Sequence, residues 1–144
     1  RMTFNITSMN DISRLKITDF YFTHEIKTRF RDVDAFKHVN NAVFLSYFED
    51  ARRCFFERWH INLKEKSLIV ASIKIDYIHQ ITHPSNCIIG QRVSRLGNTS
   101  FDIFSILFCN DKQASISTTT IVCYDFLKNK SISLYPEIIN DFNK

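Results

Sequence analysis

One long segment of this 144-residue chain carries a helical hydrophobic repeat, and strand-like patterns lie on both sides of it. From Asn41 onward, apolar side chains recur every three or four residues and form a single wide stripe. The stripe consists of Phe44, Phe48, Ala51, Phe55 and Trp59. An apolar stripe this wide predicts a largely buried helix, from Asn41 to about Trp59, packed on a sheet.

The segments around this helix show the alternation that is typical of strands. Residues 22–31 alternate apolar and polar side chains, which predicts a strand with one apolar face. Four strand-like runs follow the predicted helix, at residues 67–79, 87–96, 100–109 and 113–125. Gly90 in the second of these runs suggests a β-bulge.

This order of elements predicts an α+β fold in which an antiparallel sheet of five to six strands wraps around one long central helix. Residues 1–21 have no sustained pattern and are predicted to be an extension, ordered at most in part. Residues 22–144 are predicted to form one domain, and Pro136 is predicted to begin a C-terminal tail. A single helix on a single sheet leaves surface that a second copy of the chain would cover.

Composition disfavours several classes of protein. The net charge is +4 with the basic residues dispersed, so nucleic acid is not an expected partner. Only two glycines occur, too few for a glycine-rich phosphate loop. None of the four cysteines forms a C-x-x-C pair, and we expect no metal. Cys109 and Cys123 are predicted to be buried thiols, which suits a reducing, cytoplasmic setting. The sequence has no apolar run long enough to span a membrane and no secretory apolar region.

The segment from Arg31 to Asn41 concentrates polar chemistry directly before the helix. It contains the carboxylates Asp32 and Asp34, the imidazole of His38, and the amides Asn40 and Asn41. Asn40 is a favourable N-cap residue. Backbone N–H groups at a helix N-terminus stabilise developing negative charge, so this turn is a candidate reaction centre.

The same turn carries a family resemblance. The matching residues are Arg31-Asp32-Val33-Asp34, His38-Val39-Asn40-Asn41, Phe44, Tyr47-Phe48-Glu49 and Ala51-Arg52, with support from Ile75-Asp76-Tyr77 and from Leu96-Gly97-Asn98-Thr99-Ser100-Phe101. This pattern resembles the hotdog-fold acyl-CoA thioesterases of the 4-hydroxybenzoyl-CoA thioesterase family. Lys37 departs from it, because many members have Gly at this position.

The resemblance implies hydrolysis of acyl-CoA thioesters to free acid and CoA without a bound cofactor or metal. Asp34 takes the position of the carboxylate that acts as nucleophile or general base. The backbone N–H of Asn41 is then the oxyanion donor. His38 either orients Asp34, a water molecule or the substrate, or is only a turn residue.

Further expectations concern the residues around this centre. Substrate contacts are expected from Asn40, Phe36, Phe44, Tyr47 and Tyr77. Asp32 is expected to be structural and paired with Arg29 or Arg31. Glu49 is either a second carboxylate that reaches a neighbouring subunit's site or a solvated helix residue.

Similar proteins are homodimers or dimers of dimers with the site at the subunit boundary, so a homo-oligomer, including a homotetramer, with a role in lipid metabolism is expected. One alternative is a thioesterase that acts on acyl carrier protein. Others are a non-catalytic acyl-binding hotdog protein, or a hotdog dehydratase, which the absence of a His within the helix before His60 disfavours. The sequence leaves the acyl group open.

Overall fold

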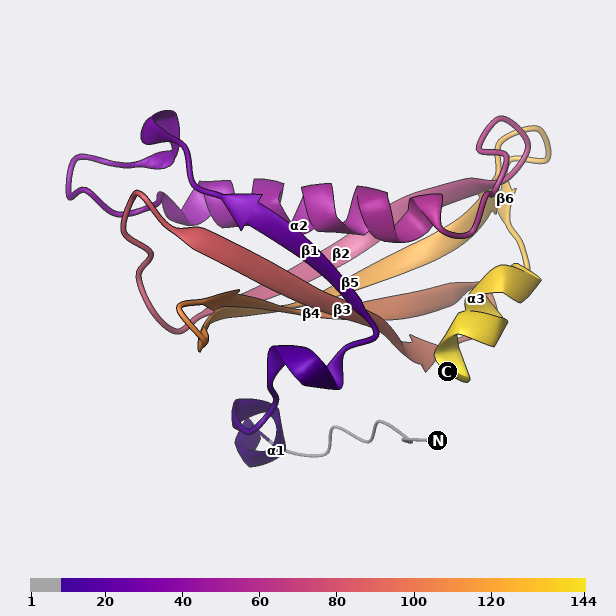
Figure 1. Cartoon of the computed structure of the whole chain (residues 1–144). Coiled ribbons are helices and arrows are strands. Elements are labelled where there is room, and N and C mark those ends of the chain that lie inside the picture. The colour runs from indigo at the N-terminus through magenta and orange to yellow at the C-terminus, as the bar shows by residue number, and fades with distance from the viewer. Residues whose placement is uncertain (1–8) are drawn as a thin grey trace.

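One long helix lies along the inner side of a curled antiparallel sheet, and the N-terminal segment lies on the opposite, outer side (Figure 1). The structure is a computed structural model that describes residues 9–144. The part of the predicted N-terminal extension that precedes Met9 lies outside the described residues. The arrangement of helix and sheet is the one that the sequence predicts.

The elements follow one another in a simple order along the chain. They are α1 (Met9–Ser13), the 3₁₀ turn η1 (Ile17–Asp19), β1 (Phe22–Lys27), the 3₁₀ turn η2 (Phe30–Asp32), α2 (Asn41–Glu57), β2 (Ser67–Tyr77), β3 (Asn86–Leu96), β4 (Ser100–Cys109), β5 (Lys112–Asp125), β6 (Lys130–Ser131) and α3 (Pro136–Phe142). None of the helices in the described part of the chain is long and apolar enough to cross a membrane.

The helix α2 forms where its apolar repeat predicts. Its stripe is buried against the inner face of the sheet, with Phe44, Phe48, Ala51 and Phe55 at most 2% exposed. Burial of each such phenylalanine stabilises the fold by about 1.5–3 kcal/mol. The helix ends at Glu57, two residues earlier than predicted, because the chain tightens into a turn there.

The sheet has the strand order β1-β3-β4-β5-β2, with the short β6 paired to β5. All pairings are antiparallel. The strand β2 therefore lies at one edge of the sheet, although it directly follows α2 in the chain, and β1 lies at the other edge. This order places the beginning of α2 and the end of β2 close together.

The outer face of the sheet is covered by the N-terminal segment. Phe20 is 7% exposed and packs with Phe104 and Phe108 of β4. A Cβ atom at Gly90 would lie 2.5 Å from the Phe20 ring. The predicted bulge at Gly90 is wrong, because Gly90 pairs regularly with both neighbouring strands. Glycine stands there because the ring of Phe20 occupies the space of a side chain.

The first strand is shorter than its alternation predicts. β1 ends at Lys27, and η2 turns the chain back over residues 30–32. The carboxylate of Asp32 accepts hydrogen bonds from the backbone N–H and the guanidinium of Arg29, which closes this turn. Phe30, predicted on the apolar face, is 86% exposed as a result.

The predicted C-terminal tail is instead a docked helix. Pro136 begins α3, as a residue without a backbone N–H can at a first helical position. Asp141 of α3 is 2% exposed and accepts hydrogen bonds from the guanidinium of Arg58 and the indole N–H of Trp59, the latter at 2.7 Å. These contacts tie the end of α2 to α3.

Cys109 is buried as predicted, but it is not a free thiol. Its register partner across the β3–β4 ladder is Cys87, and the two sulfur atoms form a disulfide. Cys123 is a buried free thiol, and burial raises its pKa. The spacing of the cysteines in the sequence does not predict the pairing of Cys87 with Cys109. That pairing depends on the register of β3 against β4, which the turn between the two strands sets.

Candidate active site at the start of α2

The polar turn before α2 closes on itself as a short two-stranded ladder. Val33 and Val39 form an antiparallel bridge. The Asp34 N–H donates to the His38 carbonyl at 2.9 Å, and the Asn40 N–H donates to the Asp32 carbonyl at 2.9 Å. Asp34 is therefore held beside the residues that lead directly into the helix.

The N-terminus of α2 is capped as predicted. The Asn40 side-chain oxygen accepts from the Ala42 N–H at 2.9 Å, and its carbonyl accepts from the Val43 N–H at 2.9 Å. Asn41 is the first residue of the helix, so its N–H has no carbonyl acceptor within the helix. The cap thus uses the N–H groups of Ala42 and Val43 and leaves the N–H of Asn41 outside the capping bonds.

The two oxygens of Asp34 have different surroundings. Oδ1 accepts from the backbone N–H of Phe36 at 2.9 Å and from that of His38 at 3.3 Å. Within residues 9–144, Oδ2 makes no hydrogen bond that satisfies ordinary geometry. The carboxylate is half-buried, so it is oriented by the turn while one oxygen remains open to react.

His38 contacts Asp34 through its backbone and not through its ring. Its main chain also bridges to Thr82. The Nδ1 atom of its imidazole is buried and has no hydrogen-bond partner among the described residues. Buried polar atoms of this kind normally bind a protein group, a water molecule or a ligand. The ring of His38 therefore has one hydrogen-bonding atom that no described residue satisfies.

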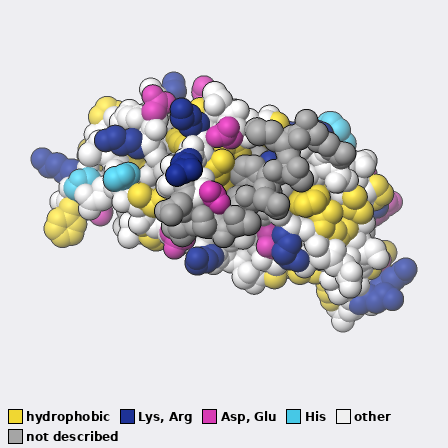
Figure 2. All heavy atoms as spheres, turned by 90° about the horizontal axis from the view of Figure 1, so that it is seen from below, with side chains coloured by type: hydrophobic (Ala, Val, Ile, Leu, Met, Phe, Trp, Pro, Cys, Tyr) yellow, Lys and Arg dark blue, Asp and Glu magenta, His cyan; other side chains and the backbone are white. Residues whose placement is uncertain are grey.

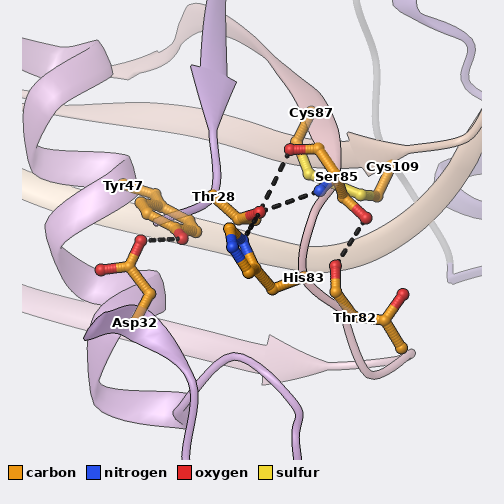
Figure 3. Close-up of a disulfide and its surroundings, with 8 residues drawn as sticks. All are labelled: Thr28, Asp32, Tyr47, Thr82, His83, Ser85, Cys87 and Cys109. Atoms are coloured by element: carbon orange, nitrogen blue, oxygen red, sulfur yellow. Dashed lines mark hydrogen bonds between the residues drawn. A yellow bond between two sulfur atoms is a disulfide. The ribbon is translucent and has the colours of Figure 1, made fainter. Parts of the chain in front are cut away.

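Asp32, at the base of the same turn, is engaged on both oxygens. It is 2% exposed, and the Tyr47 hydroxyl donates to it at 2.6 Å (Figure 3). Arg29 donates to it through its backbone and its guanidinium. Burial raises the pKa of Asp32, but the hydrogen bonds from Tyr47 and Arg29 outweigh burial and hold the pKa below its usual value. The predicted pairing with Arg29 is confirmed, and the engagement of both oxygens is consistent with the expected structural role.

The aromatic residues proposed for the substrate fall into two groups. Tyr77 of β2 reaches the start of α2, where its hydroxyl donates to the Asn41 carbonyl at 2.9 Å. The centroid of its ring lies 5.2 Å from that of the Phe44 ring. Phe44 is 1% exposed and Tyr77 is 45% exposed. The structure thus brings Asn41, Phe44 and Tyr77 together.

The side chains of Tyr47 and Phe36 are not brought to Tyr77 in the same way, although the Tyr47 ring stacks beside Phe44. Tyr47 is 4% exposed, and burial together with its bond to Asp32 raises its pKa. Phe36 stands at the tip of the turn and is 79% exposed. Since Phe36 and Tyr77 both remain exposed to solvent, no other element in the described part of the chain covers these side chains at the Asp34 turn.

The segment between β2 and β3 supports the turn, a role that no pattern in the sequence indicates. The Val39 N–H donates to the Ile81 carbonyl at 2.8 Å. The Thr28 hydroxyl lies 2.8 Å from Nδ1 of His83 and accepts from the Ser85 N–H at 2.9 Å (Figure 3). These contacts join residues about forty to sixty positions apart, so no local pattern could indicate them.

Glu49 lies exposed on α2, beside Arg52, which is 6% exposed. Burial lowers the pKa of Arg52, and the charge of Glu49 partly offsets this effect. Among the described residues, no group of three or more His, Cys, Asp or Glu side chains is arranged to hold a metal ion.

Comparison with known proteins identifies a family and several solved structures of similar fold. The model of the thioesterase-like superfamily matches residues 28–142. A thioesterase from Thermus thermophilus, solved in complex with coenzyme A and zinc, is 28% identical, with a TM-score of 0.78 over 87% of this chain and 99% of that one. The PA5185 protein from Pseudomonas aeruginosa is 23% identical, with a TM-score of 0.79 over 89% of this chain and 93% of that one.

One relative found by sequence has no described function. The uncharacterized protein YsmA of Bacillus subtilis is 30% identical over 88 residues, which are 60% of each chain. The likeness in structure confirms the hotdog fold for the chain.

Proposed function

The chain belongs to the thioesterase-like superfamily, and from this premise we propose that it hydrolyses acyl-CoA thioesters at the Asp34 turn. The observation that carries the proposal is the asymmetry of the Asp34 carboxylate. Two backbone N–H groups hold one oxygen, and the other faces no partner in the described chain. The coenzyme A bound to the Thermus thioesterase supports CoA as the carrier of the acyl group.

Asp34 can carry out the hydrolysis as a general base. Its open oxygen takes a proton from a water molecule while the water oxygen bonds to the thioester carbonyl carbon. The N–H of Asn41, aided by the helix dipole, stabilises the resulting oxyanion. The C–S bond then breaks, and the CoA thiolate leaves and takes up the proton.

Asp34 can also act as a nucleophile. Its oxygen then attacks the carbonyl carbon directly, expels the thiolate, and forms an anhydride that water hydrolyses. A single turnover with excess enzyme in ¹⁸O-labelled water separates the two routes. The general-base route places ¹⁸O in the free acid. The nucleophilic route, with water attacking the Asp34 carbonyl, places an unlabelled oxygen from the enzyme there.

Two further roles are proposed for neighbouring side chains. The unpaired Nδ1 of His38 positions water or the thioester, and Asn40, Phe44 and Tyr77 line the acyl side of the site. Phe36 and Tyr47 are proposed to join them when the substrate and a second subunit are present. The second subunit is needed because Phe36 and Tyr77 at this turn are exposed to solvent in the single chain.

A second copy is proposed to bind along β2. This edge strand has eleven residues and, within residues 9–144, pairs only with β5. Val70 and Ile73 on it are 41% and 39% exposed. Exposed edge strands with apolar side chains favour strand addition. In sedimentation velocity we expect the wild type to be a dimer or a dimer of dimers. Ile73→Lys should yield monomers, whereas Thr23→Lys on the opposite edge strand should not.

The test of the function is thiol release from a panel of acyl-CoAs with short, long and aromatic acyl groups. The same acyl groups attached to acyl carrier protein form the second arm, because the net charge of +4 also suits an acidic carrier. Turnover on CoA esters supports the proposal and identifies the acyl preference. Turnover only on the carrier protein moves the function to the alternative substrate, and the absence of turnover on both favours a binding role.

A further inference from the structure

A groove of about 870 Å³ lies on the outer side of the sheet, between the N-terminal segment and the turn that joins β4 to β5. We call it the outer groove. Its walls are residues 13–16 on one side and residues 111–113 on the other. Its volume lies in the range of sites that hold small ligands, about 300–1,000 Å³. The outer groove is separate from the Asp34 turn, which lies on the α2 side of the sheet (Figure 1).

The floor of the outer groove is aliphatic. It consists of Leu15, Ile78 and Ile116. Ile116 and Leu15 belong to the apolar cluster beneath the N-terminal segment, and Ile78 is 42% exposed. Such a floor removes an alkyl chain from water. The imidazole of His79 also lines the groove, and it is the aromatic ring among the lining residues.

Three cations stand on the rim of this floor, namely Arg14, Lys16 and Lys112. None of the three forms an ion pair with another residue of the described chain. Asp111 is the acidic residue among the lining side chains. Figure 2 views the molecule from this side and shows Lys and Arg side chains close to hydrophobic ones. An anionic group beside an apolar chain is the ligand chemistry that such a rim and floor complement.

The wall formed by the N-terminal segment is fixed to the sheet. The side-chain amide of Gln113 donates to the Ile12 carbonyl at 2.8 Å and to the Leu15 carbonyl at 3.0 Å. The Lys16 N–H donates to the Asp19 carboxylate at 2.8 Å, which shapes the turn that follows. Because these bonds hold the backbone of the wall, the outer groove is largely preformed, as small-molecule sites usually are.

We propose that the outer groove binds a long-chain carboxylate, with the carboxylate group among the three rim cations and the alkyl chain on the aliphatic floor. This binding site is separate from the thioester site and does not depend on the proposed hydrolysis. A free fatty acid is the simplest ligand of this class, and it is also the product class of a thioesterase. Occupancy of the outer groove would therefore report on the amount of free acid without blocking the Asp34 turn.

The test is calorimetric titration of the full chain with sodium dodecanoate. We expect saturable binding that is about tenfold weaker in the triple variant Arg14→Ala/Lys16→Ala/Lys112→Ala, because this variant removes all three rim cations that would face the carboxylate. The matched control Lys64→Ala/Lys128→Ala/Lys130→Ala removes the same charge from other exposed positions and should bind like the wild type. Dodecyltrimethylammonium, with the opposite charge, should not bind.

Three results of binding experiments would overturn this proposal. The first is equal affinity for dodecanoate in the groove variant and the wild type, and the second is equal affinity for the cationic amphiphile. The third is displacement of dodecanoate by coenzyme A, which would assign it to the thioester site. The groove variant should also keep thiol release within about twofold of wild type, and it should keep the wild-type sedimentation coefficient. A changed coefficient would make the outer groove an interface between copies and would contradict the proposal.

Discussion

The base and the tip of the turn before α2 each hold an aspartate, and the two differ in almost every physical respect. Asp32 at the base is buried and bonded to Tyr47 and Arg29. Asp34 at the tip is half-buried, and the turn's own backbone holds only one of its oxygens. A carboxylate with every lone pair engaged stabilises the fold, whereas one with an open oxygen is free to act on a substrate.

The largest effect on stability is expected at the base. Asp32→Asn removes the charge that draws bonds from Arg29 and Tyr47, and hydrogen bonds to a charged group contribute about 1.5–3 kcal/mol each. Because asparagine retains part of this bonding, we expect the free energy of unfolding to fall by roughly 2 kcal/mol. Urea denaturation measures this loss. An unchanged midpoint would mean that the base does not support the turn.

Tyr47→Phe should have a smaller effect of the same kind. It removes the hydroxyl at 2.6 Å from Asp32 and leaves the bonds from Arg29 in place. A loss of about 1–2 kcal/mol in the free energy of unfolding is expected. Combining Tyr47→Phe with Asp32→Asn in a double-mutant cycle should give clear non-additivity, because both changes remove the same bond. Additive losses would show that the two side chains act independently.

The base should also confer a dependence of stability on pH. The pKa of Asp32 is lowered in the folded state, so the unfolded chain binds the proton more tightly. Its contribution is therefore complete above the unfolded pKa of about 4 and is lost as the pH falls through the lower, folded value. The difference in unfolding free energy between wild type and Asp32→Asn should shrink below about pH 4. A difference that stays constant from pH 7 to pH 3 would contradict the role assigned to Asp32.

The smallest effect is expected at the tip, where Lys37 has a φ of +65°. The left-handed backbone region favours glycine, which many members of the resembling family carry at this position. Lys37→Gly should therefore raise the free energy of unfolding by up to about 1 kcal/mol. Lys27→Gly in the extended strand β1 is the matched control and should destabilise the chain. If both changes destabilise, the turn does not require the left-handed conformation.

Sequence patterns predicted the parts of the molecule that depend on local periodicity. The single apolar stripe predicted α2 to within two residues of its end, and alternation predicted β4 at Ser100–Cys109. The cap at Asn40 was also predictable, because capping needs only a suitable side chain directly before the stripe. The pairing of Asp32 with Arg29 followed from their nearness in the chain.

Features that depend on contacts between residues far apart along the chain could not be predicted from the sequence. The packing of Phe20 over Gly90 explains a glycine that resembled a bulge. The docking of α3 through Asp141, and the support of the turn by Ile81, each join residues forty or more positions apart. For the site itself, the sequence identified Asp34 as the candidate but held no sign of which oxygen would remain open.

The most direct test of the account is thiol release from the preferred acyl-CoA by Asp34→Asn, with urea denaturation of the same sample. Asparagine keeps the oxygen that accepts from Phe36 and His38, so the turn should persist and the unfolding midpoint should match that of wild type. Turnover should fall by at least about 10²-fold, as expected when a catalytic base is removed. Near wild-type turnover in a normally folded variant would contradict the assignment of Asp34 as the reacting carboxylate.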